Sequence, residues 1–268
     1  MTILEEIVAH KRKEVNEKKE LYPIKLLEKS LFYETQPISL SKYVTRSDKS
    51  GIIAEIKRRS PSNPSINLNV SIERTSIGYM QSGASALSIL TDSKYFGGKN
   101  GDLTVARKFN FCPILRKDFI LDEYQIIEAK SIGADAILLI AAALDEKQLT
   151  SLAEFAKNLG LEVLLEIHSK EEITDEVLKA SNILGINNRN LKTMEVSLEN
   201  SVEMFDHLPR AAVKISESGI KTPEDVLRLR SAGYHGFLIG ELFMKHGRPE
   251  RACMKFIDQL QKLEAQLA

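Results

Sequence analysis

Short apolar segments recur along the chain at a nearly constant spacing. Eight segments have the length and apolar content of β-strands: 51–57, 86–91, 112–117, 135–140, 162–167, 183–187, 212–216 and 236–240. From about residue 54 to about residue 238 these segments make seven intervals, with a mean step of about 26 residues. A repeat of that size accommodates one strand, one helix and two loops.

Helices are predicted between most of these strands. Four of them, over 71–82, 123–131, 146–158 and 223–232, end just before Gly83, Gly133, Gly160 and Gly233. Glycine readily adopts the left-handed backbone that ends a helix. Alternating strands and helices indicate a parallel sheet, and eight units favour an α/β fold closed into a (β/α)8 TIM barrel. An open, doubly wound sheet is the alternative, but no GxGxxG motif follows the first strand.

Residues 1–48 lie outside the repeat. Ile3, Ile7 and Val8, mixed with charged residues, predict one amphipathic helix, and 23–31 predicts a shorter one. We expect both to cover one end of the barrel. Residues 248–267 are predicted as the eighth helix. The chain shows no internal linker, so residues 1–268 are expected to form one domain with 1–48 as an N-terminal helical extension.

Polar side chains gather at the carboxyl ends of five predicted strands. Side chains alternate along a strand, so residues two apart point to the same face. The polar residues at the strand ends therefore share a face with the apolar residues two positions before them. Unpaired buried charge is costly, and catalytic residues of barrels lie at the carboxyl ends of the strands. These residues therefore predict a polar pocket above an apolar barrel. They are Glu55, Lys57, Lys117, Glu166, Asn187, Arg189 and Glu217.

Two glycine-containing loops are predicted to bind phosphate. Ser218-Gly219 follows the seventh strand and Gly240-Glu241 follows the eighth. In barrels, these two loops and a short helix N-terminus commonly form a phosphate site. The loop 58–65, with two prolines and three serines, is expected to lie over the pocket.

The overall composition argues against several classes of function. Lys plus Arg and Asp plus Glu each number 37, so there is no basic excess for nucleic acid. The longest apolar run, 136–144, has nine residues, whereas a membrane helix needs about 20. We expect no membrane contact and, because a secretory signal pattern is lacking, a cytoplasmic protein. Two cysteines without a CxxC pattern and five histidines without ligand spacing predict no metal. His168 is expected beside the pocket or at the surface.

Seven segments together are similar to the indole-3-glycerol-phosphate synthase family of tryptophan biosynthesis. They are IAEIKRRSPS (53–62), SILTDSKYFGG (88–98), ILRKDFILDEYQI (114–126), EVLLEIHS (162–169), GINNRNL (185–191), SESGI (216–220) and GFLIGELFM (236–244). The resemblance runs from about residue 2 to the end. It implies ring closure of 1-(2-carboxyphenylamino)-1-deoxyribulose 5-phosphate with loss of carbon dioxide and water, without metal or cofactor.

The resemblance also implies roles for individual residues. Lys117 matches the general acid that protonates the ketone oxygen, Glu166 its partner acid/base, and Lys57 the residue that holds the anthranilate carboxylate. Glu55, Asn187, Arg189 and Glu217 match polar pocket residues; Ser60, Ser218, Gly219, Gly240 and Glu241 match phosphate contacts; Phe96, Phe119 and Leu191 match apolar contacts to the aromatic ring. Glu241 departs from the Ser found in many members.

Three other functions remain open on the residues alone. One is a Schiff-base aldolase with Lys117 as nucleophile, and the second is an isomerase on the same phosphate-binding barrel, which would not need Lys57. The third is a metabolite-binding protein without catalysis, which the Lys117–Glu166 pair disfavours. The expected partner is a small phosphorylated substrate. The chain is expected to be a monomer or weak homodimer that is not fused to a second barrel.

Overall fold

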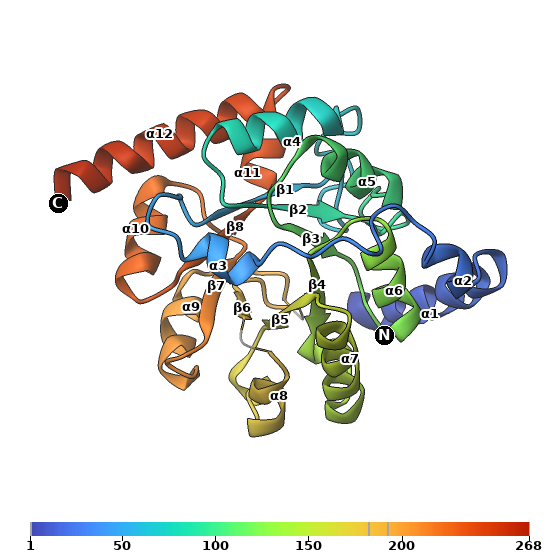
Figure 1. Ribbon diagram of the computed structural model, residues 1–268. Coiled ribbons are helices and arrows are strands. Elements are labelled where there is room, and N and C mark those ends of the chain that lie inside the picture. The colour runs from blue at the N-terminus through green and yellow to red at the C-terminus, as the bar shows by residue number, and fades with distance from the viewer. Residues whose placement is uncertain (1, 182, 192, 268) are drawn as a thin grey trace.

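Eight parallel strands close into a barrel (Figure 1). The computed structural model describes residues 2–181, 183–191 and 193–267. The strands are β1 Ile52–Ile56, β2 Ala86–Leu90, β3 Ile114–Lys117, β4 Ala136–Ile140, β5 Glu162–Ile167, β6 Ile183–Asn187, β7 Val213–Glu217 and β8 Gly236–Ile239. Each strand pairs with its neighbours in sequence, and β1 closes the barrel by pairing with β8, Ile53 opposite Leu238. The predicted TIM barrel is confirmed, and every predicted strand is present within two residues of its expected ends.

Helices surround the strands (Figure 1). They are α4 Ile72–Gln81, α5 Asn100–Phe109, α6 Glu123–Ser131, α7 Glu146–Asn158, α8 Asp175–Ala180, α9 Glu199–Met204, α10 Pro223–Ser231, α11 Glu241–Met244 and α12 Pro249–Leu267, with 3-10 turns at Ala141–Ala143, Lys170–Glu172 and Phe205–His207. The four glycines predicted to end helices all have positive φ, between 81° and 105°. The pattern missed α5, α8 and α9, two of which have only six residues and so too little length for a clear 3.6-residue period. No helix in the described ranges is long and apolar enough to cross a membrane.

The barrel interior is closed at its amino-terminal end by α3, Leu40–Val44. Leu40 and Val44 are buried among the inward-facing residues of the strands, which include Ile53 and Leu238. Polar contacts hold the helix there: Glu162, at the start of β5, accepts hydrogen bonds from the hydroxyls of Ser39 and Ser41 at 2.8 and 2.6 Å. This helix has only five residues, too few to show a helical period, so the sequence pattern did not predict it.

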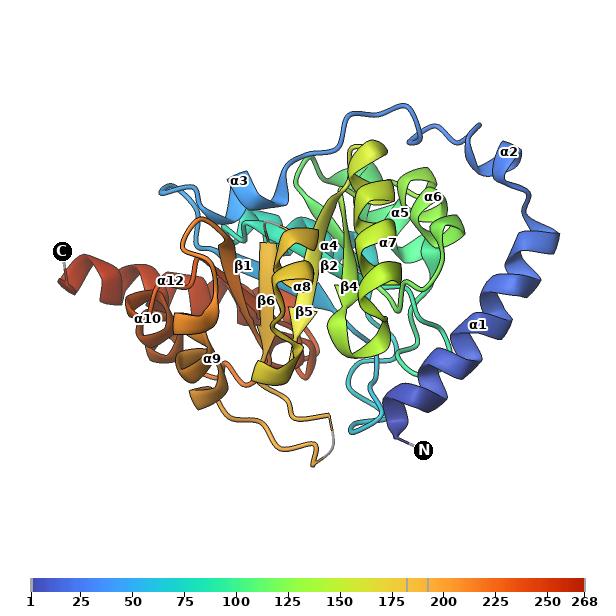
Figure 2. The same cartoon turned by 90° about the horizontal axis from the view of Figure 1, so that it is seen from below.

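The N-terminal extension reaches both ends of the barrel, and the expectation that it covers one end was wrong. Helix α1, Ile3–Leu21, begins beside the carboxyl ends of the strands, whereas α3 lies at the opposite end (Figure 2). The helix predicted over 23–31 is shorter, α2 Ile24–Leu27. It ends early because the Ser30 hydroxyl bonds the Ser131 carbonyl and accepts from the Phe32 N–H, an alternative to continued helical bonding.

A buried lysine joins α1 to the carboxyl ends of β2 and β3. The Lys11 ammonium lies 2.9 Å from Asp92 Oδ2 and 3.0 Å from Asp118 Oδ1, and all three side chains are at most 1% exposed. Glu14, one turn along α1, accepts from the same ammonium at 2.9 Å. Burial alone would lower the pKa of Lys11, but the three carboxylates outweigh it and raise that pKa. Lys11 is therefore a fully charged group inside the protein.

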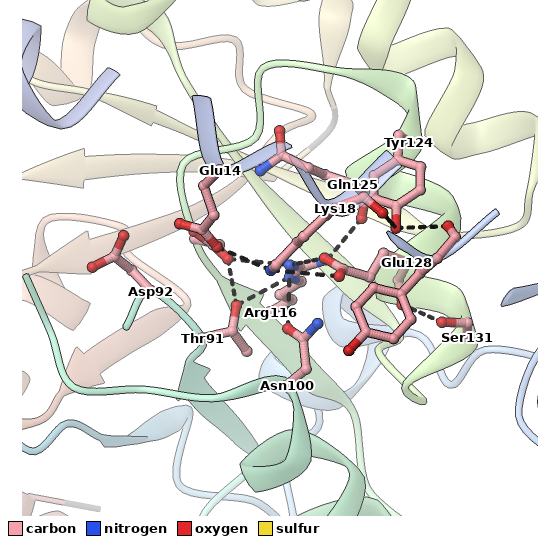
Figure 3. Close-up of polar contacts among 12 residues, drawn as sticks. Glu14, Lys18, Thr91, Asp92, Asn100, Arg116, Tyr124, Gln125, Glu128 and Ser131 are labelled. Carbon is pink, nitrogen blue, oxygen red and sulfur yellow. Dashed lines mark hydrogen bonds and ion pairs between the residues drawn. The ribbon is translucent and has the colours of Figure 1, made fainter. Parts of the chain in front are cut away.

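Arg116 extends this network toward α6 (Figure 3). Its guanidinium is buried and lies 3.1 Å from Asp118 Oδ2 and 2.5 Å from Glu128 Oε2, while its Nε donates to Thr91 Oγ1 at 3.0 Å. Glu128 is also 3.5 Å from Lys18 of α1. Arg116 alternates with Lys117 on β3, so it points away from the barrel interior, between strand and helix. The network thus ties α1, β2, β3 and α6 into one unit.

The same carboxylates position two loops above the barrel. Asp92 Oδ1 accepts the Phe96 N–H at 3.2 Å, and Asp118 Oδ1 accepts the Phe119 N–H at 2.8 Å. Asp118 also follows Lys117 directly in the chain. A largely buried charge network therefore sets the backbone of two predicted ring-contact residues.

Replacing Leu40 by Ala should lower the free energy of unfolding by about 2–5 kcal/mol, because it leaves a cavity in the closed end of the barrel. Urea denaturation would measure the change. Leu31→Ala is the matched control, since Leu31 is 82% exposed and its loss should change stability by less than about 0.5 kcal/mol. Equal effects of the two substitutions would contradict a plugging role for α3.

Replacing Lys11 by Met should destabilise the protein by about 3–5 kcal/mol, because it leaves the buried Asp92 without its cation and Asp118 with Arg116 alone. The exposed Lys13 on the same helix supplies the control, Lys13→Met. Chemical denaturation at pH 7 should separate the two variants clearly. A Lys11→Met protein as stable as the control would show that the network carries little free energy.

Candidate active site

A cavity lies at the carboxyl ends of the strands, and the structure brings all fifteen predicted site residues to its wall. They are Glu55, Lys57, Ser60, Phe96, Lys117, Phe119, Glu166, Asn187, Arg189, Leu191, Glu217, Ser218, Gly219, Gly240 and Glu241. Ile3, Leu4 and Ile7 of α1 complete the wall. The sequence analysis did not assign these three, although the apolar face of α1 carried the signal.

Lys117 forms the centre of the polar group. It ends β3, and its ammonium lies 2.5 Å from Glu166 Oε2 on β5 and 2.6 Å from Glu217 Oε2 on β7. Sequence reasoning paired Lys117 with Glu166 alone, so the equally close Glu217 is a finding of the structure. Gly185 on β6 makes room for it, since a Cβ there would lie 2.3 Å from Glu217 Oε1.

The two carboxylates differ in proton affinity. Burial raises the pKa of Glu217, and with the Glu166 charge nearby it reaches about 7 despite Lys117. Burial also opposes ionisation of Glu166, but Lys117 and His168 outweigh it and hold the pKa of that carboxyl well below its usual range. Burial lowers the pKa of Lys117, but the carboxylates of Glu166, Glu217 and Glu55 outweigh burial and raise that pKa above its ordinary value. At neutral pH Lys117 is therefore a protonated ammonium, Glu166 is an ionised carboxylate, and Glu217 is a carboxyl that titrates.

A second ion pair lies on β1. Lys57 Nζ is 2.9 Å from Glu55 Oε1, and the Lys57 side chain is 18% exposed toward the cavity it lines. Glu55 packs closely against the loop after β8, where a Cβ on Gly240 would lie 2.4 Å from Glu55 Oε1. Lys57 can therefore exchange its carboxylate partner for one on a ligand without leaving the cavity wall.

The loops after β7 and β8 present backbone donors to the cavity. Ser218 and Gly219 adopt left-handed conformations, with φ of 67° and 83°. Within the described ranges, the N–H groups of Gly219, Ile220, Glu241 and Leu242 donate no hydrogen bond to the protein, and all four residues line the cavity. A non-glycine residue in a strained conformation beside unpaired donors is typical of a binding loop. This is the arrangement an anion requires.

Apolar groups surround the other side of the cavity. The Phe96 and Phe119 rings lie 5.9 Å apart between centroids, in a tilted arrangement. Leu191, after β6, and the start of α1 also line the cavity. Arg189 is partly committed to its own loop, since its Nη1 donates to the Met194 carbonyl at 3.2 Å. The cavity thus combines an apolar region with three cationic side chains, Lys57, Lys117 and Arg189, and an anion loop.

His168 lies closer to the centre than expected. It is buried, lines the cavity, and its Nε2 is 3.2 Å from Glu166 Oε1. Burial lowers the pKa of His168, but Glu166 and Glu172 raise it above its ordinary value. His168 therefore helps to keep Glu166 ionised. Among the described residues, no group of three or more His, Cys, Asp or Glu side chains could hold a metal ion.

The comparisons with known proteins agree with one another. The family model of indole-3-glycerol phosphate synthase matches residues 4–256. The synthase of Bacteroides thetaiotaomicron is 49% identical over 259 residues, 97% of this chain and 99% of that protein. The synthase of Caldanaerobacter subterraneus subsp. tengcongensis is 44% identical over 245 residues, 91% of this chain and 93% of that protein. A solved thiamine phosphate pyrophosphorylase from Pyrococcus furiosus shares the fold alone, with a TM-score of 0.59 and 14% identity over 83% of this chain and 99% of its own.

One glutamate carboxyl carbon should titrate with a midpoint of about 7 in a ¹³C NMR titration, and Glu217→Gln should remove that signal. Because the pKa is raised in the folded state, Glu217 should lower stability as the pH rises from about 4.5 to about 7, and the variant should lose this decline. Glu166→Gln should move the midpoint downward, because it removes the neighbouring negative charge. A wild-type spectrum without a glutamate that titrates near neutral pH would contradict the assignment.

Proposed function

The chain belongs to the indole-3-glycerol phosphate synthase family, and we propose that Lys117 is the general acid of its reaction and Glu166 the partner acid/base. The protein is a carboxy-lyase of tryptophan biosynthesis. It converts 1-(2-carboxyphenylamino)-1-deoxyribulose 5-phosphate to indole-3-glycerol phosphate, carbon dioxide and water. The residue roles below are part of the proposal.

The reaction needs one proton donor and one proton acceptor close together. The aromatic carbon that bears the carboxylate attacks the ketone carbon, and the ketone oxygen takes a proton from the Lys117 ammonium. The carbon–carboxylate bond breaks, carbon dioxide leaves, and its electron pair restores the aromatic ring. Glu166 then takes a proton from the carbon next to the nitrogen and passes it to the leaving hydroxyl, which departs as water. The proton lost by Lys117 is replaced from solvent.

The observation that carries this proposal is the position of Lys117 between two carboxylates in a cavity that also offers two anion sites. Its pKa is raised, so Lys117 begins the reaction protonated, as an acid must. The low pKa of Glu166 keeps that group ionised, as a base must be. Glu217 holds the other side of the ammonium and, with a pKa of about 7, adjusts the charge of the site near neutral pH.

Three features would hold the substrate in place. Lys57, which already pairs with Glu55, would bind the anthranilate carboxylate, and Arg189 also lines the cavity. The unpaired N–H groups after β7 and β8, with Ser60, would bind the phosphate. Phe96, Phe119 and Leu191 would pack on the aromatic ring. Glu55 and Asn187 would complete the polar wall.

The raised pKa of Lys117 disfavours a Schiff-base aldolase, because a protonated amine is not a nucleophile. An isomerase whose substrate carries no carboxylate would give Lys57 no ligand group to bind, only its partner Glu55. We further propose that the chain acts as one barrel domain, as a monomer or weak homodimer. We place it in the cytoplasm, because Cys112 and Cys253 are buried free thiols, as is common in reducing compartments.

The direct test mixes purified protein with the carboxyphenylamino substrate and follows indole fluorescence without added metal. Fluorescence should rise with enzyme concentration. Borohydride added with substrate should trap no covalent adduct on Lys117, whereas an aldolase would form one. Absence of indole fluorescence would refute the assignment of the reaction to this cavity.

Lys117→Ala should lower kcat by about 10²–10⁴ or more, with a smaller effect on KM, because the proton donor is lost. Lys117→Arg should be nearly as inactive, since guanidinium releases its proton far less readily than ammonium. Lys57→Ala should instead raise KM and lower kcat together, because it removes an orienting contact. Steady-state kinetics would separate these patterns. A Lys117→Ala enzyme within a few-fold of the parent kcat would move the acid role to Lys57.

A further inference from the structure

The proposed phosphate site contains a carboxylate, which is unexpected where a dianion must bind. Glu241 is the first residue of α11, and its backbone N–H is one of the unpaired donors of the site. Its side chain is half-buried on the wall of the cavity. A carboxylate beside a bound phosphate weakens phosphate binding by Coulomb repulsion. The direction in which the Glu241 carboxylate points therefore affects the strength of phosphate binding.

Asn63, in the loop between β1 and α4, fixes that orientation. Its Nδ2 donates to Glu241 Oε1 at 3.2 Å, and its Oδ1 accepts from the Ser65 N–H at 3.4 Å. A carboxylate can only accept and a backbone N–H can only donate, so the amide of Asn63 has one consistent orientation, with its NH₂ toward Glu241.

The loop that carries Asn63 is itself held against α11. The N–H groups of Ile66 and Asn67 both donate to the Arg58 carbonyl at 3.0 Å, which closes the loop at its base. Asn67 Nδ2 donates to the carbonyls of Met244 and His246, both at 3.1 Å. The loop therefore contacts both ends of α11. These hydrogen bonds hold Asn63 in place beside Glu241.

We propose that Glu241 determines the affinity of the phosphate site and that Asn63 is a positioning residue, which holds the Glu241 carboxylate away from the bound anion. This inference rests on the proposed function, because it requires a phosphate ester between the loops after β7 and β8. The backbone donors attract the anion, the charge of Glu241 opposes them, and Asn63 limits that opposition. The loop after β1 thereby acts on phosphate binding through the neutral amide of Asn63.

The test uses Glu241→Gln, Asn63→Ala and the double variant, with inorganic phosphate as the probe in isothermal titration calorimetry. Glu241→Gln keeps an acceptor for Asn63 but removes the charge, and should bind phosphate about tenfold more tightly, with a similar fall in KM for the substrate. Asn63→Ala should bind phosphate several-fold more weakly. In the Glu241→Gln background the Asn63 substitution should have little effect, because no charge remains to be held away.

Glu224→Gln is the matched control, because Glu224 is an exposed glutamate on α10 that does not line this cavity. It should change neither phosphate affinity nor KM. The inference is overturned if Glu241→Gln binds phosphate no more tightly than the parent. It is also overturned if Asn63→Ala weakens binding equally in both backgrounds, since Asn63 would then only place the loop. If the proposed function is wrong, the parent enzyme will not catalyse ring closure. The phosphate titration can still be interpreted in that case, so the two failures can be told apart.

Discussion

The enclosed charge of Lys11 is the interaction on which the upper end of the molecule depends. Asp92 and Asp118 lie inside the protein at the start of the loops after β2 and β3, and burying a carboxylate without a cation is costly. Arg116 pairs with Asp118, but Asp92 needs a second cation. Helix α1 supplies that cation. The requirement brings a helix from outside the repeat to the carboxyl end of the barrel, and with it the apolar residues that complete the cavity wall. The extension is therefore part of the site rather than a separate cover.

Lys11 and Lys117 both lie among buried carboxylates, and the exposure of each side chain separates their roles. Lys11 is 1% exposed and contacts no cavity, so its ion pairs hold the structure together. Lys117 is 12% exposed and lines the cavity, so a ligand can reach its ammonium. The two are connected, because Asp118, which binds Lys11, follows Lys117 in the chain. A charge that holds the structure together, Asp118, and the charge that a ligand reaches, Lys117, are thus adjacent residues at the carboxyl end of β3.

The eight strands and the polar residues at their carboxyl ends could be predicted because each depends on local order along the chain. The assignments of Ser60, Phe96, Phe119 and Leu191 came from the family resemblance instead. Alternation places Glu55 and Lys57 on the inner face of β1, and no distant contact is needed to see it. Other features depend on pairs far apart in sequence. Lys11 meets Asp118, Glu217 meets Lys117, and α3 fills the barrel from outside the repeat. Periodicity says where a side chain points, but it does not say which distant group lies opposite.

Charge accounting also explains why the cavity suits its substrate before and after reaction. The substrate brings a carboxylate and a phosphate, which the proposal assigns to Lys57 and to the backbone donors beside Gly219. When carbon dioxide leaves, Lys57 loses its ligand partner, and Glu55, 2.9 Å away, is already in place to neutralise it. The phosphate keeps its donors throughout. The ion pair on β1 therefore spares the site an unpaired Lys57 charge after decarboxylation, and this limits the free energy lost when the carboxylate departs.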